Sequence, residues 1–181
     1  MTQKLSLLIV LAITVLMFTS LTLPDNHHKK IKTGLKNGNI APEIVLPTPE
    51  GEQIALSSLR GKMVFIDFWA SWCKGCREVS RKLRPFYEKY KDGEFINGKG
   101  FVVLSVSLDT DRERWLNAIE EDSMQCFINV SDLKGFDSPV ASDYKFTWVP
   151  EGYLIDGNGV IIDFKSSDFK STLESLLVAN N

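Results

Sequence analysis

Two cysteines separated by two residues, Cys73 and Cys76, are the side chains in this 181-residue sequence best suited to chemistry. The run before them, residues 63–70, is apolar and aromatic and predicts a buried strand, and the residues after them follow a helical pattern. A cysteine at a helix start lies near unpaired N–H groups and the positive end of the helix dipole, which favour its thiolate. The second cysteine, about one turn further on, can close a disulfide with the first. The spacing therefore predicts a dithiol–disulfide redox site.

The same spacing also occurs in half of a zinc site, which would need two further ligands at suitable positions. The sequence offers one other cysteine, Cys126, and two histidines, His27 and His28, in a polar stretch that we interpret as solvated. We therefore expect no metal, and no cofactor besides the Cys73–Cys76 disulfide. Cys126 precedes a short apolar run and is interpreted as a buried, unreactive thiol. A third redox thiol or an intermolecular disulfide is the alternative.

A single acid, Asp67, interrupts the apolar run ahead of the cysteines. A carboxyl in such surroundings has a raised pKa because burial disfavours its charged form, and this suits it to proton transfer near neutral pH. The alternative is an acid at the end of the strand that faces solvent. Lys74, between the two cysteines, adds a positive charge that is expected to lower the pKa of the neighbouring thiol.

The string Asp-Phe-Trp-Ala-Ser-Trp-Cys-Lys-Gly-Cys-Arg, residues 67–77, resembles the active-site segment of thioredoxins. The surrounding sequence resembles their membrane-tethered, extracytoplasmic branch, the TlpA/ResA-like thiol–disulfide oxidoreductases. Residues 40–62, with two β-prone runs around a Pro/Gly turn, resemble the N-terminal extension that thioredoxin itself lacks, and residues 106–115 and 129–135 also match the branch. The resemblance implies an α/β, thioredoxin-like fold with a central mixed sheet flanked by helices and an N-terminal β-hairpin extension.

The resemblance also assigns roles to individual residues. Cys73 would attack a substrate disulfide, Cys76 would resolve the mixed disulfide, and Asp67 would take the proton of the second cysteine. In thioredoxin-like proteins a cis-proline faces the two cysteines, and the backbone beside it pairs with the substrate chain. Pro150 and Val149 hold these places in the string Trp-Val-Pro-Glu-Gly-Tyr-Leu-Ile-Asp. An ordinary trans proline in a turn is the alternative.

The sequence also departs from the family around this site. Gly75 stands where the Cys-Gly-Pro-Cys form has proline, so the reduction potential is not set by the motif alone. Val79 and Arg81 stand where the branch usually has Glu and Pro, which leaves one evident buried acid. Glu151 follows the proline, where small hydroxylated residues are common; an acid there would either oppose thiolate formation or favour basic substrates. Trp72 is expected to shape the docking surface.

The N-terminal part of the sequence predicts two segments ahead of the domain. Residues 5–23 are apolar, uncharged and nearly long enough to span a bilayer, and they predict a signal anchor, with a cleaved signal peptide over residues 1–23 as the alternative. Residues 24–39 are polar and predict a linker, and residues 40–181 would form the thioredoxin-like domain. Lysines follow the apolar run as well as precede it, so the positive-inside rule does not fix the orientation of the anchor in the membrane. The placement outside the cytoplasm, in the periplasm or on the outer face of the membrane, is therefore implied by the resemblance.

Composition excludes one class of partner: the net charge is -2, and no basic cluster with aromatic residues indicates nucleic-acid binding. The resemblance implies an enzyme that reduces disulfides in other proteins, as in cytochrome c maturation, and that a membrane electron-donor protein reduces in turn. One alternative is a peroxiredoxin-like peroxidase, which would need a Thr/Ser-rich loop where this chain has Trp-Ala-Ser-Trp. The other is a metal-binding thioredoxin-like module, which would pair C-x-x-x-C with a downstream histidine that the domain lacks.

Overall fold

The computed structural model describes residues 31–164 and 169–178, in which strands and helices alternate. The strands are β1 (Val45–Pro47), β2 (Gln53–Ala55), β3 (Met63–Trp69), β4 (Glu94–Phe95), β5 (Gly98–Lys99), β6 (Phe101–Ser107), β7 (Ile128–Val130), β8 (Glu151–Ile155) and β9 (Ile161–Phe164). The helices are α2 (Lys74–Tyr90), α3 (Arg112–Glu121), α4 (Pro139–Asp143) and α5 (Phe169–Ser175), with short 3-10 helices η1 (Leu56–Leu59) and η2 (Gly135–Asp137).

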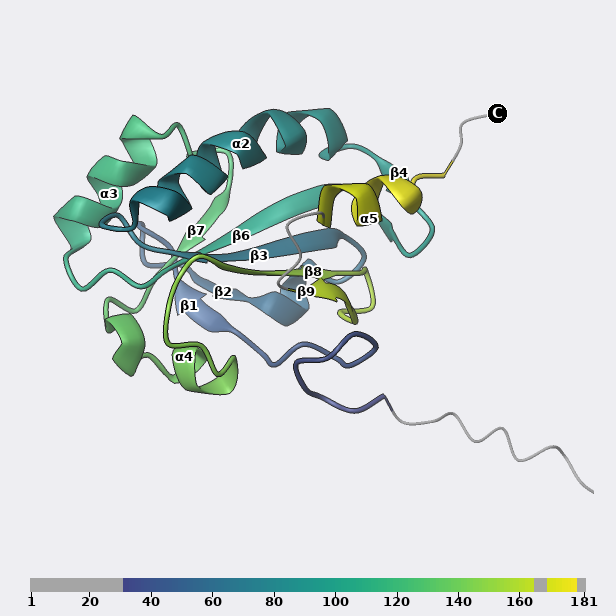
Figure 1. The fold of residues 1–181 in the computed structure, drawn as a ribbon, viewed down its shortest axis with the longest axis horizontal. Helices are drawn as coiled ribbons and strands as arrows, with labels where there is room; N and C mark the ends of the chain where they lie inside the picture. The colour runs from purple at the N-terminus through teal and green to yellow at the C-terminus, as the bar shows by residue number, and fades with distance from the viewer. Residues whose placement is uncertain (1–30, 165–168, 179–181) are drawn as a thin grey trace, which may run out of the picture. The chain divides into compact units, whose positions relative to one another are not determined.

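A five-stranded mixed sheet in the order β7-β6-β3-β8-β9 forms the centre of the fold (Figure 1). Strand β3 lies in the middle, parallel to β6 and antiparallel to β8. All seven of its residues are buried, as expected of a near-continuous apolar run covered on both faces. The predicted fold class is confirmed, and so is the N-terminal hairpin, in which β1 pairs with β2.

Each face of the sheet has its own apolar core. Helices α2, α3 and α5 cover one face, and the β1–β2 hairpin and α4 cover the other (Figure 1). Alternation along β3 sends Phe65 and Trp69 to the first core and Ile66 and Phe68 to the second. Asp67 has the same parity as Phe65 and Trp69, so its side chain lies on the face that α2 covers.

Three local features differ from or refine the sequence-based expectations. The glycines of residues 92–100 predict a loop after α2. The structure has the small antiparallel β4–β5 hairpin there, where an added Cβ on Gly98 would lie 3.1 Å from the sulfur of Met63. Asp109 and Asp111 precede α3, and acids in that place are predicted to cap a helix. Asp111 is the N-cap, whereas Asp109 forms other hydrogen bonds, described below. Cys126 is half-buried, and burial raises the pKa of its thiol, which disfavours the reactive thiolate.

The predicted anchor over residues 5–23, together with His27 and His28, lies outside the described residues. Within the described ranges, no helix has the length and apolar character needed to cross a membrane. Part of the predicted linker is tied to the domain by backbone hydrogen bonds: the Gly34 N–H donates to Ile40 and the Gly38 N–H to Ile161. The domain boundaries stay a prediction.

Candidate active site

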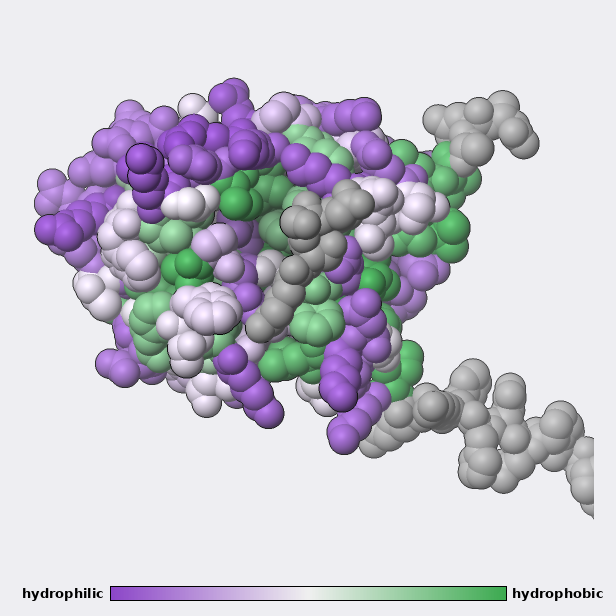
Figure 2. All heavy atoms as spheres, viewed as in Figure 1, coloured by the Kyte–Doolittle hydropathy of each residue, from purple (hydrophilic) through white to green (hydrophobic). Residues whose placement is uncertain are grey.

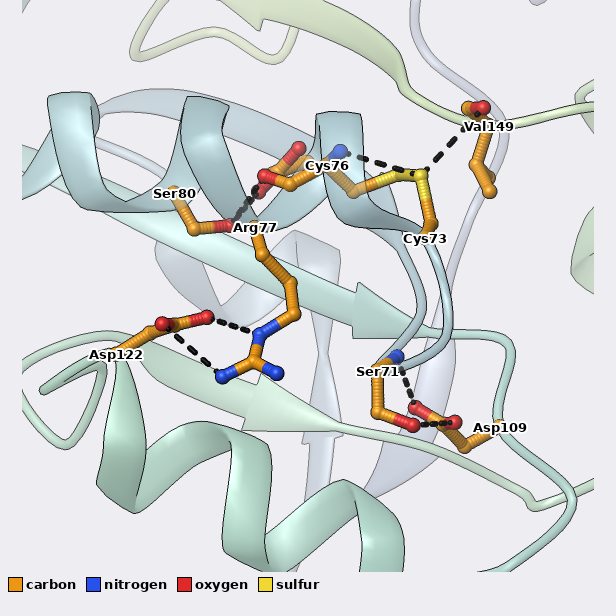
Figure 3. Close-up of a disulfide and its surroundings, with 9 residues drawn as sticks. Ser71, Cys73, Cys76, Arg77, Ser80, Asp109, Asp122 and Val149 are labelled. Atoms are coloured by element: carbon orange, nitrogen blue, oxygen red, sulfur yellow. Dashed lines mark hydrogen bonds and ion pairs between the residues drawn. A yellow bond between two sulfur atoms is a disulfide. The ribbon is translucent and has the colours of Figure 1, made fainter.

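Helix α2 begins directly after Cys73, which is its N-cap residue. Cys73 and Cys76 are joined by a disulfide, with their Cα atoms 5.2 Å apart (Figure 3). The Cys76 N–H donates to the Cys73 sulfur over 3.1 Å. Cys76 is fully buried, whereas Cys73 is half-buried. Cys73 is therefore the sulfur that a second molecule can reach, and the helix start stabilises negative charge on it.

The loop before β8 lies against this sulfur. The carbonyl oxygen of Val149 is 3.7 Å from the Cys73 sulfur, and the Val149–Pro150 peptide bond is cis. Pairing of β8 with β3 fixes the place of the loop, since Glu151 is in register with Phe68 near the end of β3 that leads to the cysteines. The structure thus brings together the two sequence segments that the resemblance places side by side.

Asp67 is 1% exposed and lies beneath the first turns of α2. Burial raises its pKa from 3.8 to about 7, and a hydrogen bond from the Ser80 hydroxyl, over 3.3 Å, partly opposes this rise. The Ser80 hydroxyl is also 3.1 Å from the carbonyl oxygen of Cys76. The interpretation of Asp67 as a solvent-facing strand-end acid is therefore wrong, and a carboxyl that titrates near neutral pH lies next to the turn of helix that carries Cys76.

A cavity of about 420 Å³ adjoins Asp67. It is also lined by Pro150, Glu151 and Val79, with apolar walls from Phe65 and other side chains. Glu151, 6% exposed, therefore belongs to the interior of the site and faces the same space as the other carboxyl. Val79, where the branch usually has Glu, contributes an apolar wall, so the second acid in this cavity comes from β8 instead of α2.

The turn that leads into Cys73 is held from behind by a buried carboxylate. Asp109 accepts hydrogen bonds from the Ser71 N–H over 2.9 Å and the Ser71 hydroxyl over 2.6 Å (Figure 3), and from the Ser107 hydroxyl over 2.7 Å. Its side chain is nearly inaccessible, at 1% exposed. Since Asp109 follows β6, these bonds fasten the cysteine-bearing loop to the neighbouring strand and fix the position of Cys73.

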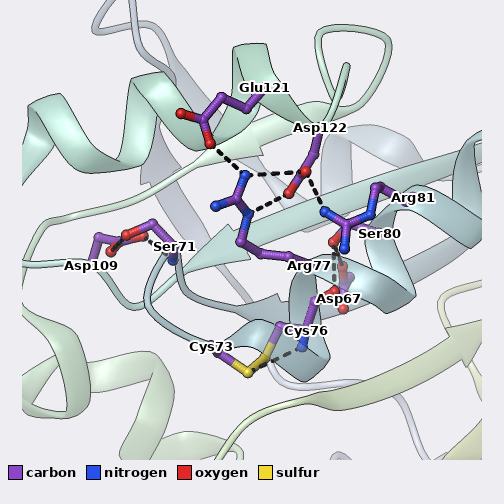
Figure 4. A network of polar contacts seen from close by, with 10 residues as sticks. All are labelled: Asp67, Ser71, Cys73, Cys76, Arg77, Ser80, Arg81, Asp109, Glu121 and Asp122. Atoms are coloured by element: carbon purple, nitrogen blue, oxygen red, sulfur yellow. Dashed lines mark hydrogen bonds and ion pairs between the residues drawn. A yellow bond between two sulfur atoms is a disulfide. The ribbon is translucent and has the colours of Figure 1, made fainter.

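A charged network fastens the first turns of α2 to the end of α3 (Figure 4). Arg77 donates to both oxygens of Asp122, over 2.6 and 3.1 Å, and to Glu121 over 2.7 Å. Arg81 donates to Asp122 over 2.6 Å. Burial alone would raise the pKa of Asp122, but the two guanidinium groups outweigh it and hold that pKa below its ordinary value. Arg81, which departs from the family pattern, therefore has a structural task here.

The remaining predicted residues lie at the rim of the site. Lys74 and Gly75 are the first two residues of α2 and are exposed. An added Cβ at Gly75 would meet no atom within 4 Å, so packing does not require glycine there. The Trp72 side chain is 57% exposed beside Cys73.

Sequence reasoning missed several residues of this site. Ser80 follows Cys76 by four positions, so helical spacing places both on the same face of α2. The available signal was a hydroxyl on the face that α2 buries, which also carries Leu83. The partnership of Ser71 with Asp109 joins positions 38 apart, and that of Arg77 with Asp122 joins positions 45 apart. No local pattern marks such pairs. Within the described residues, no group of three or more His, Cys, Asp or Glu side chains is placed to hold a metal ion.

Comparison with known proteins agrees with this geometry. Residues 37–164 match the model of the AhpC/TSA family. The chain is 29% identical over 154 residues to the thioredoxin-like protein YneN of Bacillus subtilis, covering 85% of each chain. It is 31% identical over 140 residues to the thiol-disulfide oxidoreductase ResA of Bacillus cereus, covering 73% of this chain and 70% of that one. A solved thioredoxin domain of a thiol-disulfide oxidoreductase from Bacteroides vulgatus superposes with a TM-score of 0.69 at 30% identity, covering 78% and 98% of the two chains.

Proposed function

The chain belongs to the AhpC/TSA family and is a thioredoxin-like oxidoreductase with a Cys73–Cys76 pair, and on that premise we propose that it reduces disulfides in other proteins outside the cytoplasm. The observation that carries this proposal is the asymmetry of the disulfide. One sulfur, on Cys73, is reachable and accepts an N–H at a helix start, and the other, on Cys76, is buried beside a titratable carboxyl.

The reduced enzyme begins the reaction at Cys73. Its thiolate attacks one sulfur of a substrate disulfide, which forms a mixed disulfide and releases the other substrate sulfur as a thiolate that takes a proton from water. The Cys76 N–H and the helix dipole stabilise the attacking thiolate, and Lys74 adds positive charge at the same helix end. Val149 and Pro150, opposite Cys73, offer backbone to an extended substrate segment, with Trp72 beside them.

The second step releases the substrate. Cys76 loses its proton to Asp67 and attacks the Cys73 sulfur, which closes the enzyme disulfide and expels the second substrate sulfur as a thiolate that takes a proton from water. A pKa of about 7 allows Asp67 to accept this proton near neutral pH and to return it when the disulfide is next reduced. Glu151 lines the same cavity and is the acid that would tune the site from β8.

Three further parts of the proposal concern the setting of the enzyme. Residues 5–23 would anchor the chain in the membrane, with residues 24–39 as a linker, so that the domain works in the periplasm or on the outer face. Each turnover leaves the enzyme oxidised, so an electron donor must reduce Cys73–Cys76 again, and a membrane protein would fill this role. The N-terminal apolar run, nearly long enough to span a bilayer, and the resemblance to membrane-tethered relatives support these parts.

The proposal is tested by cysteine variants of the full-length chain with a protein disulfide as substrate. We expect Cys73→Ser to abolish turnover and Cys76→Ser to accumulate a mixed disulfide with the substrate, seen by non-reducing electrophoresis. Cys126→Ser is the matched control and retains turnover, because this thiol lies outside the site. Turnover by the Cys73 variant would overturn the mechanism. Consumption of peroxide by the reduced protein, faster than its reduction of disulfides, would favour the peroxidase alternative instead.

A further inference from the structure

Large aromatic side chains gather around the reachable sulfur. Trp72 is 57% exposed and precedes Cys73, and Trp148 is 68% exposed and precedes Val149. Phe136, from η2, is 43% exposed, and its ring lies 6.3 Å from that of Trp72. Single exposed apolar residues are ordinary on a protein surface, but several aromatics around a reactive group are typical of a binding surface.

These rings rest on the core. The ring centroids of Phe136 and Phe146 lie 6.4 Å apart. Those of Phe146 and Phe68, a residue of the central strand β3, lie 4.6 Å apart. We call Trp72, Phe136 and Phe146 the aromatic platform. Because a fully buried strand residue supports it, the platform offers contact area that is already ordered before a partner binds.

Beyond Phe136 the platform continues into an open pocket of about 540 Å³ between η2 and α4. The pocket is lined by Phe136, Ala141, Ser142, Lys145, Phe146 and Thr147. Its volume is in the range of sites that hold an apolar group, and Lys145 is its one charged lining residue. Figure 2 shows hydrophobic residues in the region between α2 and α4, whereas the outward surfaces of α2 and α3 are largely hydrophilic.

Phe136 links the pocket to the reactive edge. It lines the pocket, and its ring lies 6.3 Å from that of Trp72, the residue before Cys73. A chain that meets the Cys73 sulfur therefore has the platform within reach on the α4 side. A permanent partner over this surface would hide the sulfur that turnover requires, so the occupant must leave after each reaction, as the substrate does.

We propose that the aromatic platform and this pocket bind an extended segment of the substrate, and that the pocket takes a bulky apolar side chain, phenylalanine or leucine, a few residues from the reacting cysteine. An acidic residue next to that side chain would face Lys145. This inference rests on the proposed function and names its substrate class: unfolded chains, whose apolar residues near cysteine are still exposed, rather than folded proteins, whose apolar residues are buried.

The test uses the full-length chain with Cys76→Ser and Cys126→Ser, so that Cys73 is its one thiol. Short synthetic peptides each carry one cysteine as a disulfide with thionitrobenzoate. Attack by Cys73 joins the peptide to the enzyme and releases the coloured thionitrobenzoate anion, which gives the rate. The peptides place phenylalanine or alanine at successive positions on either side of the cysteine. Glutamate or lysine stands next to that phenylalanine or alanine.

We expect one spacing at which the phenylalanine peptide reacts roughly tenfold faster than its alanine counterpart. Phe136→Ala brings this ratio close to one. Ser142→Trp, which fills the pocket from its exposed rim without removing a core side chain, does the same. Ile96→Ala is the matched control: its side chain is 66% exposed on the β4–β5 hairpin, and the ratio stays as in the parent. Lys145→Glu reverses the preference for glutamate over lysine.

The outcomes separate the two proposals. Equal rates for phenylalanine and alanine at every spacing, with Cys73 still reactive, overturn the docking inference and leave the proposed function intact. A ratio that survives both Phe136→Ala and Ser142→Trp also overturns it. If Cys73 attacks none of the peptides, the proposed function itself falls.

Discussion

Helix α2 contacts two buried carboxyls, and the two behave in opposite ways. Asp67 lies below the helix on β3 with the Ser80 hydroxyl as hydrogen-bond donor, and burial raises its pKa to about 7. Asp122 lies beside the helix with two guanidinium groups on it, and its pKa is lowered. Both side chains are nearly inaccessible to solvent, Asp67 at 1% and Asp122 at 5% exposed, but Asp67 lies deeper in the fold. Deep burial without a cationic partner therefore raises the pKa of Asp67, whereas two guanidinium groups lower that of Asp122.

The two regions also respond oppositely to pH. Between the unfolded and folded pKa values of Asp67, the folded chain holds a proton that the unfolded chain has lost, so this group reduces stability as pH rises. Asp122 has a folded pKa below its unfolded value, so it stabilises the fold above the unfolded pKa and loses that contribution as pH falls. Asp67 therefore lowers stability but can transfer a proton, whereas Asp122 stabilises the helix on which Cys76 lies.

The largest expected effect comes from removing the titratable acid. A pKa of about 7 instead of 3.8 means that Asp67 destabilises the fold by about 4 kcal/mol above pH 7 relative to pH 4. Asp67→Asn removes this dependence. The free energy of unfolding of the variant therefore increases relative to that of the wild type as pH rises. Urea unfolding of the oxidised proteins at several pH values measures the difference. Parallel stability curves for the two proteins would show that Asp67 is already ionised at low pH.

A smaller loss is expected at the charged network. Asp122→Asn leaves Arg77 and Arg81 without their buried carboxylate, and we expect a loss of about 2 kcal/mol, less than for a fully buried pair because both guanidinium groups reach solvent. The matched control is Glu121→Gln. Glu121 contacts the same Arg77 but its side chain is 63% exposed, so the expected loss is below about 0.5 kcal/mol. Equal losses in the two variants would contradict the contrast between buried and exposed partners.

The smallest expected change concerns the loop before Cys73. Ser71→Ala removes one hydroxyl from Asp109 but leaves the backbone N–H and the Ser107 hydroxyl in place. We expect a loss of about 1 kcal/mol in the free energy of unfolding. Ser58→Ala, an exposed serine bonded to a local carbonyl oxygen, serves as control and costs less. If both substitutions cost the same, Asp109 does not hold the loop as described.

The sequence predicted what local patterns encode. The apolar run of β3 and the cysteine spacing at the start of α2 follow from periodicity and from the chemistry of individual residues. The same holds for the turn ahead of β9, where residues 156–159 read Asp-Gly-Asn-Gly. The place of Val149 and Pro150 opposite Cys73 followed from resemblance to a family, because no local pattern indicates a contact such as that of Cys73 with Val149, 76 positions apart.

The rest depended on tertiary packing. Glu151 was ambiguous as a residue after a proline, and only the pairing of β8 with β3 shows that it is buried in the cavity of Asp67. Asp109 resembled a helix cap because an acid before a helix usually is one, yet its side chain turns back to Ser71. The exposure of Phe136 depends on how η2 packs against Phe146, which no pattern in its own segment specifies.

The most direct test of the account is the pH dependence of the resolving step in wild type and Asp67→Asn. A mixed disulfide is formed at Cys73, and release of the substrate thiol is followed by stopped flow. We expect the wild-type rate to rise through an apparent pKa near 7 as Asp67 ionises. The variant should lack this inflection and be slower at pH 7 by between roughly tenfold and a hundredfold. Identical profiles for the two proteins would mean that Asp67 takes no part in proton transfer from Cys76.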